Sequence, residues 1–338
     1  GVAEYYDSQS LTLENISSQD KDMRKDLGEK LYASLLKEKN KGKALEEQSR
    51  VFKVSDAEAL TKLNAANMNI KHLTRVLRWM PNLTTIDASG NDISTINLQN
   101  QKIDNKAVFP LKNVTSLNLS NNSKLNTLIL QSVSMLELSN SNLNTTTFNH
   151  VLQRVTNKLT INNPGGTVKA YALDGNSNAK IKVLHYGNSS KPLNVSYCDL
   201  DTLIINNATL GFSNLSSNAK NISIDNIVVK GQNAVVSTGN QKRINGEMVS
   251  VELNTPIAKN VIFENAVMGG SSLNDWIALT TDQLCFKGCT ATSDLTITAE
   301  GTKKLTLEKM NANVKVSSCD FSQLTLNNAS IILGGENT

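Results

Sequence analysis

Apolar residues along the chain fall into short alternating groups, which are separated by polar turns and return at similar intervals. The clearest pair runs from Leu60 to Ile70 and from Leu83 to Ile93, where the same order of apolar positions returns after 23 residues. Each group is too short to bury its apolar face alone, so neighbouring units must stack against one another. The pattern therefore predicts a solenoid built from repeated strand-and-turn units.

A helical pattern precedes these repeats. Between residues 20 and 50, apolar residues recur three to five positions apart, which is the spacing of one helix face. They are Met23, Leu27, Leu31, Leu35 and Leu36. A solenoid needs a polar-backed element over its first coil, so we expect residues 19–55 to form a helical cap rather than a partner-binding helix. Residues 1–18 are polar and irregular, and we expect them to be flexible.

Two local signals lie around the first repeats. Ser55 and Glu58 have the spacing of a capping box, which predicts the start of a short helix. Apolar residues at 73–80 predict a second helix between the two clear repeats, ending before Pro81. We expect Trp79 to be half buried in that segment. Trp276 is expected to be packed, with an exposed contact point as the alternative.

Beyond the first repeats the units shorten. The cores at Leu117 and Leu136 repeat after 19 residues, and the regular repeats extend over residues 60–143. From residue 144 to residue 338, many units carry two apolar alternations within about 20 residues, which leaves no room for a helix. We therefore predict parallel strands on more than one wall. The register is obscured at 168–186 and 232–253, where we expect insertions. One such core, Ile222 to Ile224, is expected to stack on Leu203 to Ile205.

The composition narrows the class of partner. Apolar residues make up 39% of the chain, aromatic residues 4% and charged residues 19%, with a net charge of +4. Because so small a charge is spread over a long chain without a dense basic run, we expect no nucleic-acid partner. No run of 18 apolar residues is present, so a membrane-spanning helix is not expected.

The cysteines are the first candidates for chemistry. Cys198 and Cys319 hold the same position in units about six coils apart, so they are too distant for a disulfide. Cys285 and Cys289 alone are a weak metal signal, because a zinc site needs more ligands at set spacings. The three histidines fall in different units. We therefore expect buried structural cysteines, and neither a metal nor a cofactor.

Acidic residues are the second candidates. A polysaccharide-cleaving solenoid would need clustered carboxylates on one wall, but the acids of this chain are scattered over many units. Asp225 and Glu264 follow similar strand cores and are expected to share a wall. This pair keeps a carbohydrate-active β-helix enzyme open as an alternative.

Asparagines recur where strands are predicted to end. The pairs Asn206-Asn207 and Asn327-Asn328 follow equivalent cores. Asn side chains satisfy backbone groups at turns, and stacked copies form a ladder. We expect this structural role, with sugar binding as the alternative.

The repeats at Leu60 and Leu83, together with the units at Leu117 and Leu136, resemble those of bacterial leucine-rich repeat surface proteins. The adhesin-like proteins of gut Bacteroidetes are closest in style. The resemblance implies secretion or lipid anchoring at the cell surface, and binding of host or matrix proteins or of glycans. These families have no fixed binding motif, so no binding residue can be carried over.

The repeat itself indicates where binding would occur. Residues between the strand leucines face outward, and a solenoid sheet presents them as one wall. The predicted wall residues are Thr85, Asp87, Ser116, Asn118, Met135 and Glu137. We therefore expect a non-enzymatic, secreted or cell-surface binding protein. A β-helix enzyme and a structural spacer remain the alternatives.

Overall fold

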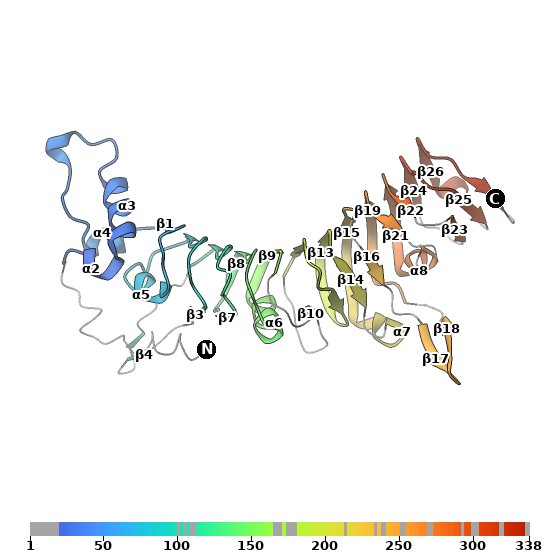
Figure 1. The fold of residues 1–338 in the computed structure, drawn as a ribbon, viewed down its shortest axis with the longest axis horizontal. Coiled ribbons are helices and arrows are strands. Elements are labelled where there is room, and N and C mark those ends of the chain that lie inside the picture. The colour runs from blue at the N-terminus through green and yellow to red at the C-terminus, as the bar shows by residue number, and fades with distance from the viewer. Residues whose placement is uncertain are drawn as a thin grey trace. The chain divides into compact units, whose positions relative to one another are not determined.

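The fold is described from a computed structural model of the chain (Figure 1). The expected flexible segment 1–18 and Cys319 lie outside the residues that the structure describes. Those are residues 20–99, 102–103, 106–107, 113–164, 171–173, 181–212, 215–232, 235–237, 241–250, 255–268, 273–291, 294–298, 304–317 and 321–334.

Helices gather at the N-terminal end, where the cap was predicted. Met23, Leu27, Leu31 and Leu35 are buried there, whereas Leu36 is half buried. The main helix ends at Lys39, well before residue 50, because the side chain of Asn40 exchanges two 2.8 Å hydrogen bonds with the backbone of Ser49. The elements are α2 (Arg24–Leu27), α3 (Glu29–Lys39), η1 (Leu45–Glu47) and α4 (Val54–Glu58).

The predicted helix start at Ser55 is displaced. Helix α4 begins after Lys53, whose backbone N–H donates to Asp56 Oδ2 at 2.8 Å. Ser55 lies inside the helix, and its N–H and hydroxyl both donate to the carboxylate of Asp20. The capping box expected at Ser55 and Glu58 was therefore wrong, because a second acceptor nearby takes the serine.

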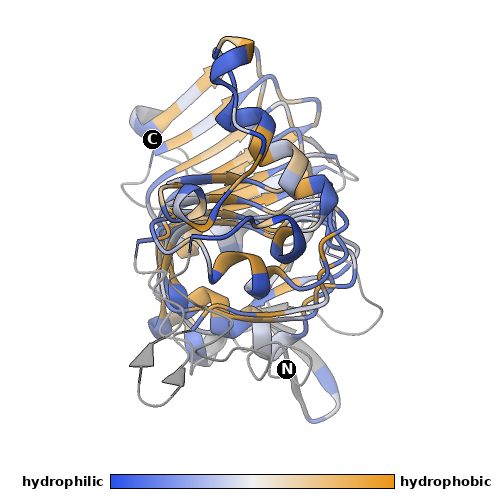
Figure 2. Cartoon of the chain, turned by 90° about the vertical axis from the view of Figure 1, so that its left-hand side faces the viewer, coloured by the Kyte–Doolittle hydropathy of each residue, from blue (hydrophilic) through white to orange (hydrophobic). Residues whose placement is uncertain are grey.

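Twelve strands form one long parallel sheet, which confirms the predicted stacking of parallel strands. Apolar and polar positions alternate along these strands (Figure 2). In sheet order they are β1 (Lys62–Asn64), β2 (Thr85–Asp87), β6 (Ser116–Asn118), β8 (Val133–Glu137), β9 (Val155–Asn162), β11 (Val183–Gly187), β13 (Cys198–Asn206), β15 (Ile222–Lys230), β19 (Ala258–Glu264), β21 (Thr280–Lys287), β24 (Lys304–Glu308) and β26 (Leu324–Asn327).

The chain divides into two compact units. The first comprises residues 1–157 and 164–166, and the second comprises residues 158–163 and 167–338. In the first unit the predicted offset of 23 residues is confirmed, because Leu63 pairs with Ile86. The offset of 19 is confirmed by the pairing of Leu117 with Leu136.

The first unit contains further elements away from the long sheet. Strand β3 pairs with β7 in parallel, and β4 pairs with β5 in antiparallel fashion. Helix α6 was not predicted, since residues beyond 143 were expected to lack helices. Asn144 caps α6 by accepting from Thr147 N–H at 2.8 Å. These elements are β3 (Thr95–Asn97), β4 (Lys102–Ile103), β5 (Lys106–Ala107), β7 (Thr127–Ile129), α5 (Leu73–Leu77) and α6 (Thr145–Arg154).

The second unit has strands on more than one wall, as predicted. A four-stranded parallel sheet has the order β10-β12-β14-β16, and a three-stranded sheet has the order β23-β25-β27. A hairpin of β17 and β18 lies within the expected insertion at 232–253. The bounds are β10 (Tyr171–Leu173), β12 (Leu193–Val195), β14 (Thr209–Phe212), β16 (Val235–Ser237), β17 (Gln241–Ile244), β18 (Glu247–Ser250), β20 (Val267–Met268), β22 (Thr290–Ala291), β23 (Leu295–Thr298), β25 (Val314–Ser317) and β27 (Ile332–Leu333).

Short helices connect some strands of the second unit. They are α7 (Leu215–Asn218), η2 (Ala219–Asn221), α8 (Leu273–Leu279) and η3 (Phe321–Gln323). Trp276 on α8 is fully buried, and its ring meets Phe212 and Phe263 edge-on at 5.9 and 5.3 Å. The packed interpretation of Trp276 is therefore confirmed. In the first unit Trp79 is also buried, at 4% exposure, rather than half buried.

One predicted register was wrong. Leu203 pairs with Ile227 rather than with Ile222, because Ile222 pairs with Cys198 within the same nine-residue strands. Each of these strands carries two apolar pairs in series, so an alternating pattern fits both alignments. The offset between these coils is thus 24 residues instead of 19.

Every strand of the long sheet is followed by a residue with positive φ, where asparagine and glycine have the least strain. This backbone requirement accounts for the recurring Asn207 and Asn328. The twelve residues are Asn67, Gly90, Asn121, Asn140, Asn163, Asn188, Asn207, Gly231, Asn265, Gly288, Lys309 and Asn328.

None of the helices in the described residues is long and apolar enough to cross a membrane.

Candidate binding surfaces

The six predicted wall residues lie together on the first unit, in two straight rows. Thr85 pairs with Ser116, and Ser116 pairs with Met135. The same strands place Asp87, Asn118 and Glu137 in the second row. Neighbouring strands of a sheet are about 4.8 Å apart, so each row is a ladder of side chains at that spacing.

The second row has a structural task. Asp87 Oδ1 accepts from the backbone N–H of Ser89 at 3.0 Å, and Asn118 Oδ1 accepts from that of Ser120 at the same distance. Asn64, on the strand before, accepts from Ala66 N–H at 3.3 Å. These contacts are Asx turns, which satisfy the backbone where the strand ends. Asp87 and Asn118 are therefore engaged with their own turns, a role that the outward position alone did not predict.

The first row is open to a partner. Within the described part of the chain, the side chains of Thr85, Ser116 and Met135 make no hydrogen bond or ion pair. Met135 is 43% exposed, which is unusual for a large apolar side chain. Below the rows, Ile86 and Leu117 are buried, so the wall rests on packed side chains.

The second unit has an outward face of its own, with three parallel rows. The middle row is partly apolar and half buried, and it runs through Thr160, His185, Ile204, Val228, Ile262, Cys285 and Thr306. An amide ladder lies on one side, where Asn260 Nδ2 donates to Asn226 Oδ1 at 3.1 Å. Ionic residues alternate on the other side, as Lys230, Glu264, Lys287 and Glu308.

The two acids considered for catalysis are not brought together. Asp225 forms an ion pair with Lys259 at 3.3 Å, near the start of strands β15 and β19. Glu264 lies at the far end of β19, where it pairs in register with Lys230 and Lys287. The expectation that Asp225 and Glu264 share a site was wrong, because they occupy opposite ends of their strands. Each faces a lysine instead of a second carboxylate.

The titratable members of the middle row are held in neutral forms. Burial lowers the pKa of His185, and the nearby Lys230 and Lys158 lower it further. Burial also raises the pKa of the Cys285 thiol, and Glu308 adds to that effect. At neutral pH this row therefore presents an imidazole and a thiol without charge, and neither is activated as a nucleophile.

The other described cysteines are structural, as expected. Cys198 and Cys289 are buried, and burial raises the pKa of Cys198 to about 12. The thiol of Cys289 donates to the carbonyl oxygen of Phe263 at 3.3 Å. In the described residues, no group of three or more His, Cys, Asp or Glu residues is placed to hold a metal ion.

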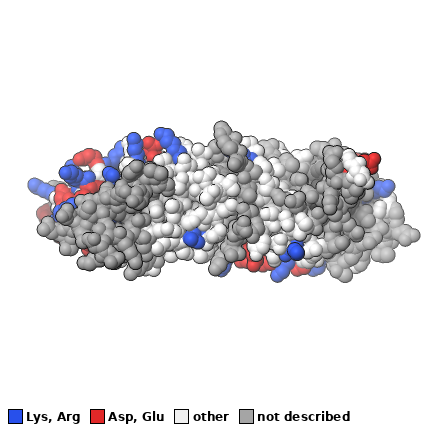
Figure 3. All heavy atoms as spheres, turned by 90° about the horizontal axis from the view of Figure 1, so that it is seen from below, with Lys and Arg blue, Asp and Glu red and all other residues white. Residues whose placement is uncertain are grey.

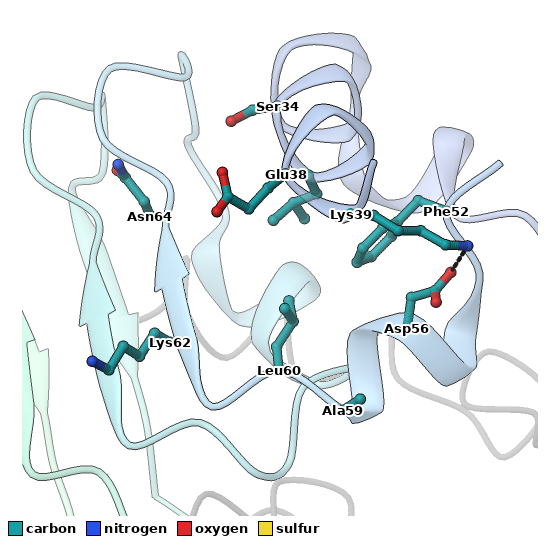
Figure 4. Close-up of a pocket in the computed structure, with 10 residues that line it drawn as sticks. Ser34, Glu38, Lys39, Phe52, Asp56, Ala59, Leu60, Lys62 and Asn64 are labelled. Carbon is teal, nitrogen blue, oxygen red and sulfur yellow. Dashed lines mark hydrogen bonds and ion pairs between the residues drawn. The ribbon is translucent and has the colours of Figure 1, made fainter. Parts of the chain in front are cut away.

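A cleft of about 500 Å³ lies between the cap and the first strand (Figure 4). Lys39 extends along it, and its ammonium donates to Asp56 Oδ2 at 2.7 Å and to the carbonyl of Val51 at 3.0 Å. Glu38 and Asn64 border the opening. Because Lys39 is fully engaged with the protein, we interpret it as a brace between α3 and α4 rather than a ligand-binding group.

Charge is distributed unevenly on the surface seen in Figure 3. Charged side chains crowd at the end that carries the cap, whereas the described coils show mostly uncharged side chains. No protein family model matches the chain. No curated protein matches its sequence significantly.

Proposed function

We propose that this chain is a non-enzymatic binding protein, secreted or held at a cell surface, that presents the outward face of its long parallel sheet to a protein or glycan. The observation that carries the proposal is the row of Thr85, Ser116 and Met135, whose side chains stand in register and uncommitted. Rigid strands hold these groups at a fixed spacing, so binding requires little ordering of the protein.

The chemistry of the row suits an uncharged partner. Two hydroxyls donate and accept hydrogen bonds, while the thioether of Met135 adds an adaptable apolar contact. A flat polar partner surface, such as a sugar chain or an extended polypeptide, complements that mixture. Because Asp87 and Asn118 are engaged in turns, we assign specificity to the first row and to Glu137 beside it.

We further propose that the first unit is of the leucine-rich repeat type. Asn91 and Asn122 support this proposal, since they occupy the asparagine position of the repeat. Asn122 Nδ2 donates to the carbonyl oxygens of Leu119 and Ala88 at 2.9 and 3.1 Å. Asn91 makes the corresponding bonds to Ala88 and Ala65, both at 2.9 Å. These contacts form the stacked asparagine ladder that such repeats use to satisfy the turning backbone.

Binding can be tested on arrays of purified matrix proteins and glycans. The wall variant Thr85→Arg/Ser116→Arg/Met135→Arg fills the row with bulk and charge, and we expect it to weaken any captured ligand by at least about 100-fold. Thr127→Arg is the matched control, because Thr127 is likewise a half-exposed strand residue of the same unit but lies on β7. Equal loss in both variants, or no loss in the wall variant, would refute the proposed surface.

The location is tested separately. Surface biotinylation of intact source cells, followed by blotting for this chain, should label it without cell lysis. Exclusive labelling after lysis would contradict a surface role. The separation of Asp225 from Glu264 leaves no observation in the described residues that favours a polysaccharide-cleaving enzyme.

A further inference from the structure

The last coil of the second unit exposes residues that every preceding coil buries. Leu305 and Leu307 on β24 are 4% and 0% exposed. Leu326 on β26 pairs in register with Leu307, yet it is 39% exposed. Leu333 on β27 pairs with Val316, which is fully buried, yet Leu333 is 63% exposed. The end of the apolar core is therefore open.

Two sheet edges end in the same coil. Strand β26 is last in the twelve-stranded sheet, and β27 is last in the three-stranded sheet. In a parallel ladder, alternate residues direct their N–H and C=O groups to opposite neighbours. No strand of the described residues lies beyond β26 or β27, so half of their backbone groups face outward from the coil. Such an edge is a template for a further strand.

The usual protection of an edge is missing here. Natural edges carry lysines, prolines or bulges that oppose pairing with another chain. Residues 324–334 contain no Asp, Glu, Lys, Arg, His or Pro. The preceding coil, residues 304–317, carries Lys304, Glu308, Lys309 and Lys315. Charge is thus absent from the one coil whose edge is open.

We propose that this end surface, defined by β26, β27 and the exposed Leu326, Ile332 and Leu333, binds a second copy of the chain end to end about a two-fold axis. In a two-fold contact each patch meets its own copy, so any charge would face a like charge. A neutral patch avoids that repulsion. The two-fold axis also makes β26 antiparallel to the partner's β26, which continues the hydrogen-bonded sheet.

Sedimentation velocity over a range of concentrations tests the proposal. The chain should form a species of twice its own mass. Leu326→Lys/Leu333→Lys places charges opposite their own copies, and we expect a dimer dissociation constant raised by at least about 100-fold. Leu45→Lys is the control, because Leu45 is 83% exposed but belongs to the cap, and it should leave the dimer unchanged. Circular dichroism and urea unfolding check that each variant folds.

A cysteine cross-link tests the orientation. Thr325 lies near the middle of β26, so Thr325→Cys brings the new thiol beside its own copy in the two-fold arrangement, within disulfide reach. Mild oxidation should yield a covalent dimer that the unsubstituted chain does not form. A monomer at every concentration would overturn the proposal and leave this surface to another segment or partner. Association unaffected by Leu326→Lys/Leu333→Lys, or open-ended polymers, would overturn it as well.

Discussion

In the first unit, strands β1, β2 and β6 are three residues long, and the positive-φ residue follows three positions after each strand ends. In the second unit, strands of five to nine residues such as β11, β13 and β15 are followed by the positive-φ residue at once. The difference lies in how the turning backbone is satisfied. Short strands depend on buried asparagine side chains, whereas long strands depend on the sheet ladder itself, with further strands on another wall.

The buried asparagines of the first unit are the costly solution. Asn122 is fully buried and bonds two carbonyl oxygens, while its own oxygen accepts from Ile93 N–H at 3.2 Å. Such a side chain is stabilising only while all its partners are in place. In the second unit the corresponding positions carry strand backbone, which needs no particular side chain.

The largest expected effect follows from removing that side chain. Asn122→Ala leaves three buried backbone groups unpaired, and we expect the first unit to lose about 3 kcal/mol of unfolding free energy. Urea unfolding followed by Trp79 fluorescence in a Trp276→Phe background measures the first unit alone. Asn126→Ala, at an exposed position, is the control and should cost about 0.5 kcal/mol or less. Equal losses in the two variants would remove the proposed distinction between the units.

The next effect concerns the turn ladder of the second unit. Gly288 has φ of 62°, and a Cβ at this position would overlap Asn265 Oδ1 from the preceding coil. We expect Gly288→Ala to cost about 2 kcal/mol, from backbone strain and overlap together. Gly246→Ala separates the two causes, because Gly246 has φ of 85° and open space around its Cβ, so it should cost about 1 kcal/mol. Urea unfolding followed by Trp276 fluorescence in a Trp79→Phe background compares them, and a reversed order would contradict the overlap.

A smaller effect of opposite sign is expected at Lys309. This lysine has φ of 49° in the position that asparagine or glycine holds in the other coils. Lys309→Asn should therefore raise the unfolding free energy of the second unit by about 0.5 kcal/mol, because asparagine tolerates the left-handed region better. Lys304→Asn, within a strand, serves as the comparison and should not stabilise. Thermal unfolding of both variants tests the claim that this position is chosen for backbone conformation.

The smallest effect is a pH dependence in the first unit. His150 Nε2 accepts the N–H of Leu130 at 3.0 Å, and burial, followed by the charge of Arg154, lowers the pKa of His150 below its ordinary 6.5. The unfolded chain then takes up a proton below pH 6.5 before the folded chain does, so stability is complete above that pH and declines below it. His150→Gln keeps an acceptor but cannot titrate there, and it should flatten the melting temperature between neutral and mildly acidic pH. An unchanged slope would count against His150 as the source.

Sequence reasoning recovered the parts of the fold in which one side-chain pattern admits one alignment. The 23-residue echo at Leu60 and Leu83 predicted the pairing of Leu63 with Ile86, because each unit there has a single short strand. The same logic placed Thr85 beside Ser116. It failed at Ile222, because β15 carries two apolar pairs and both satisfy a period of two.

The candidate surface was predictable in position but not in detail. Alternation alone indicates that Asp87 faces outward, yet its bond to Ser89 N–H depends on the turn that follows. Asp225 and Glu264 looked equivalent because similar sequences precede them, whereas the bonding register separates them along the strands. The exposure of Leu326 and Leu333 depends on what stacks next, which a local pattern does not encode.

The central claim is that the first row of the long sheet is the working surface of the first unit. Hydrogen exchange of the chain, free and bound to a ligand captured on the arrays, tests it most directly. We predict slower exchange on ligand binding in β2, β6 and β8, around Thr85, Ser116 and Met135, with β3 and β7 unchanged. Protection confined to β3 and β7, or to the cap helices, would contradict the account.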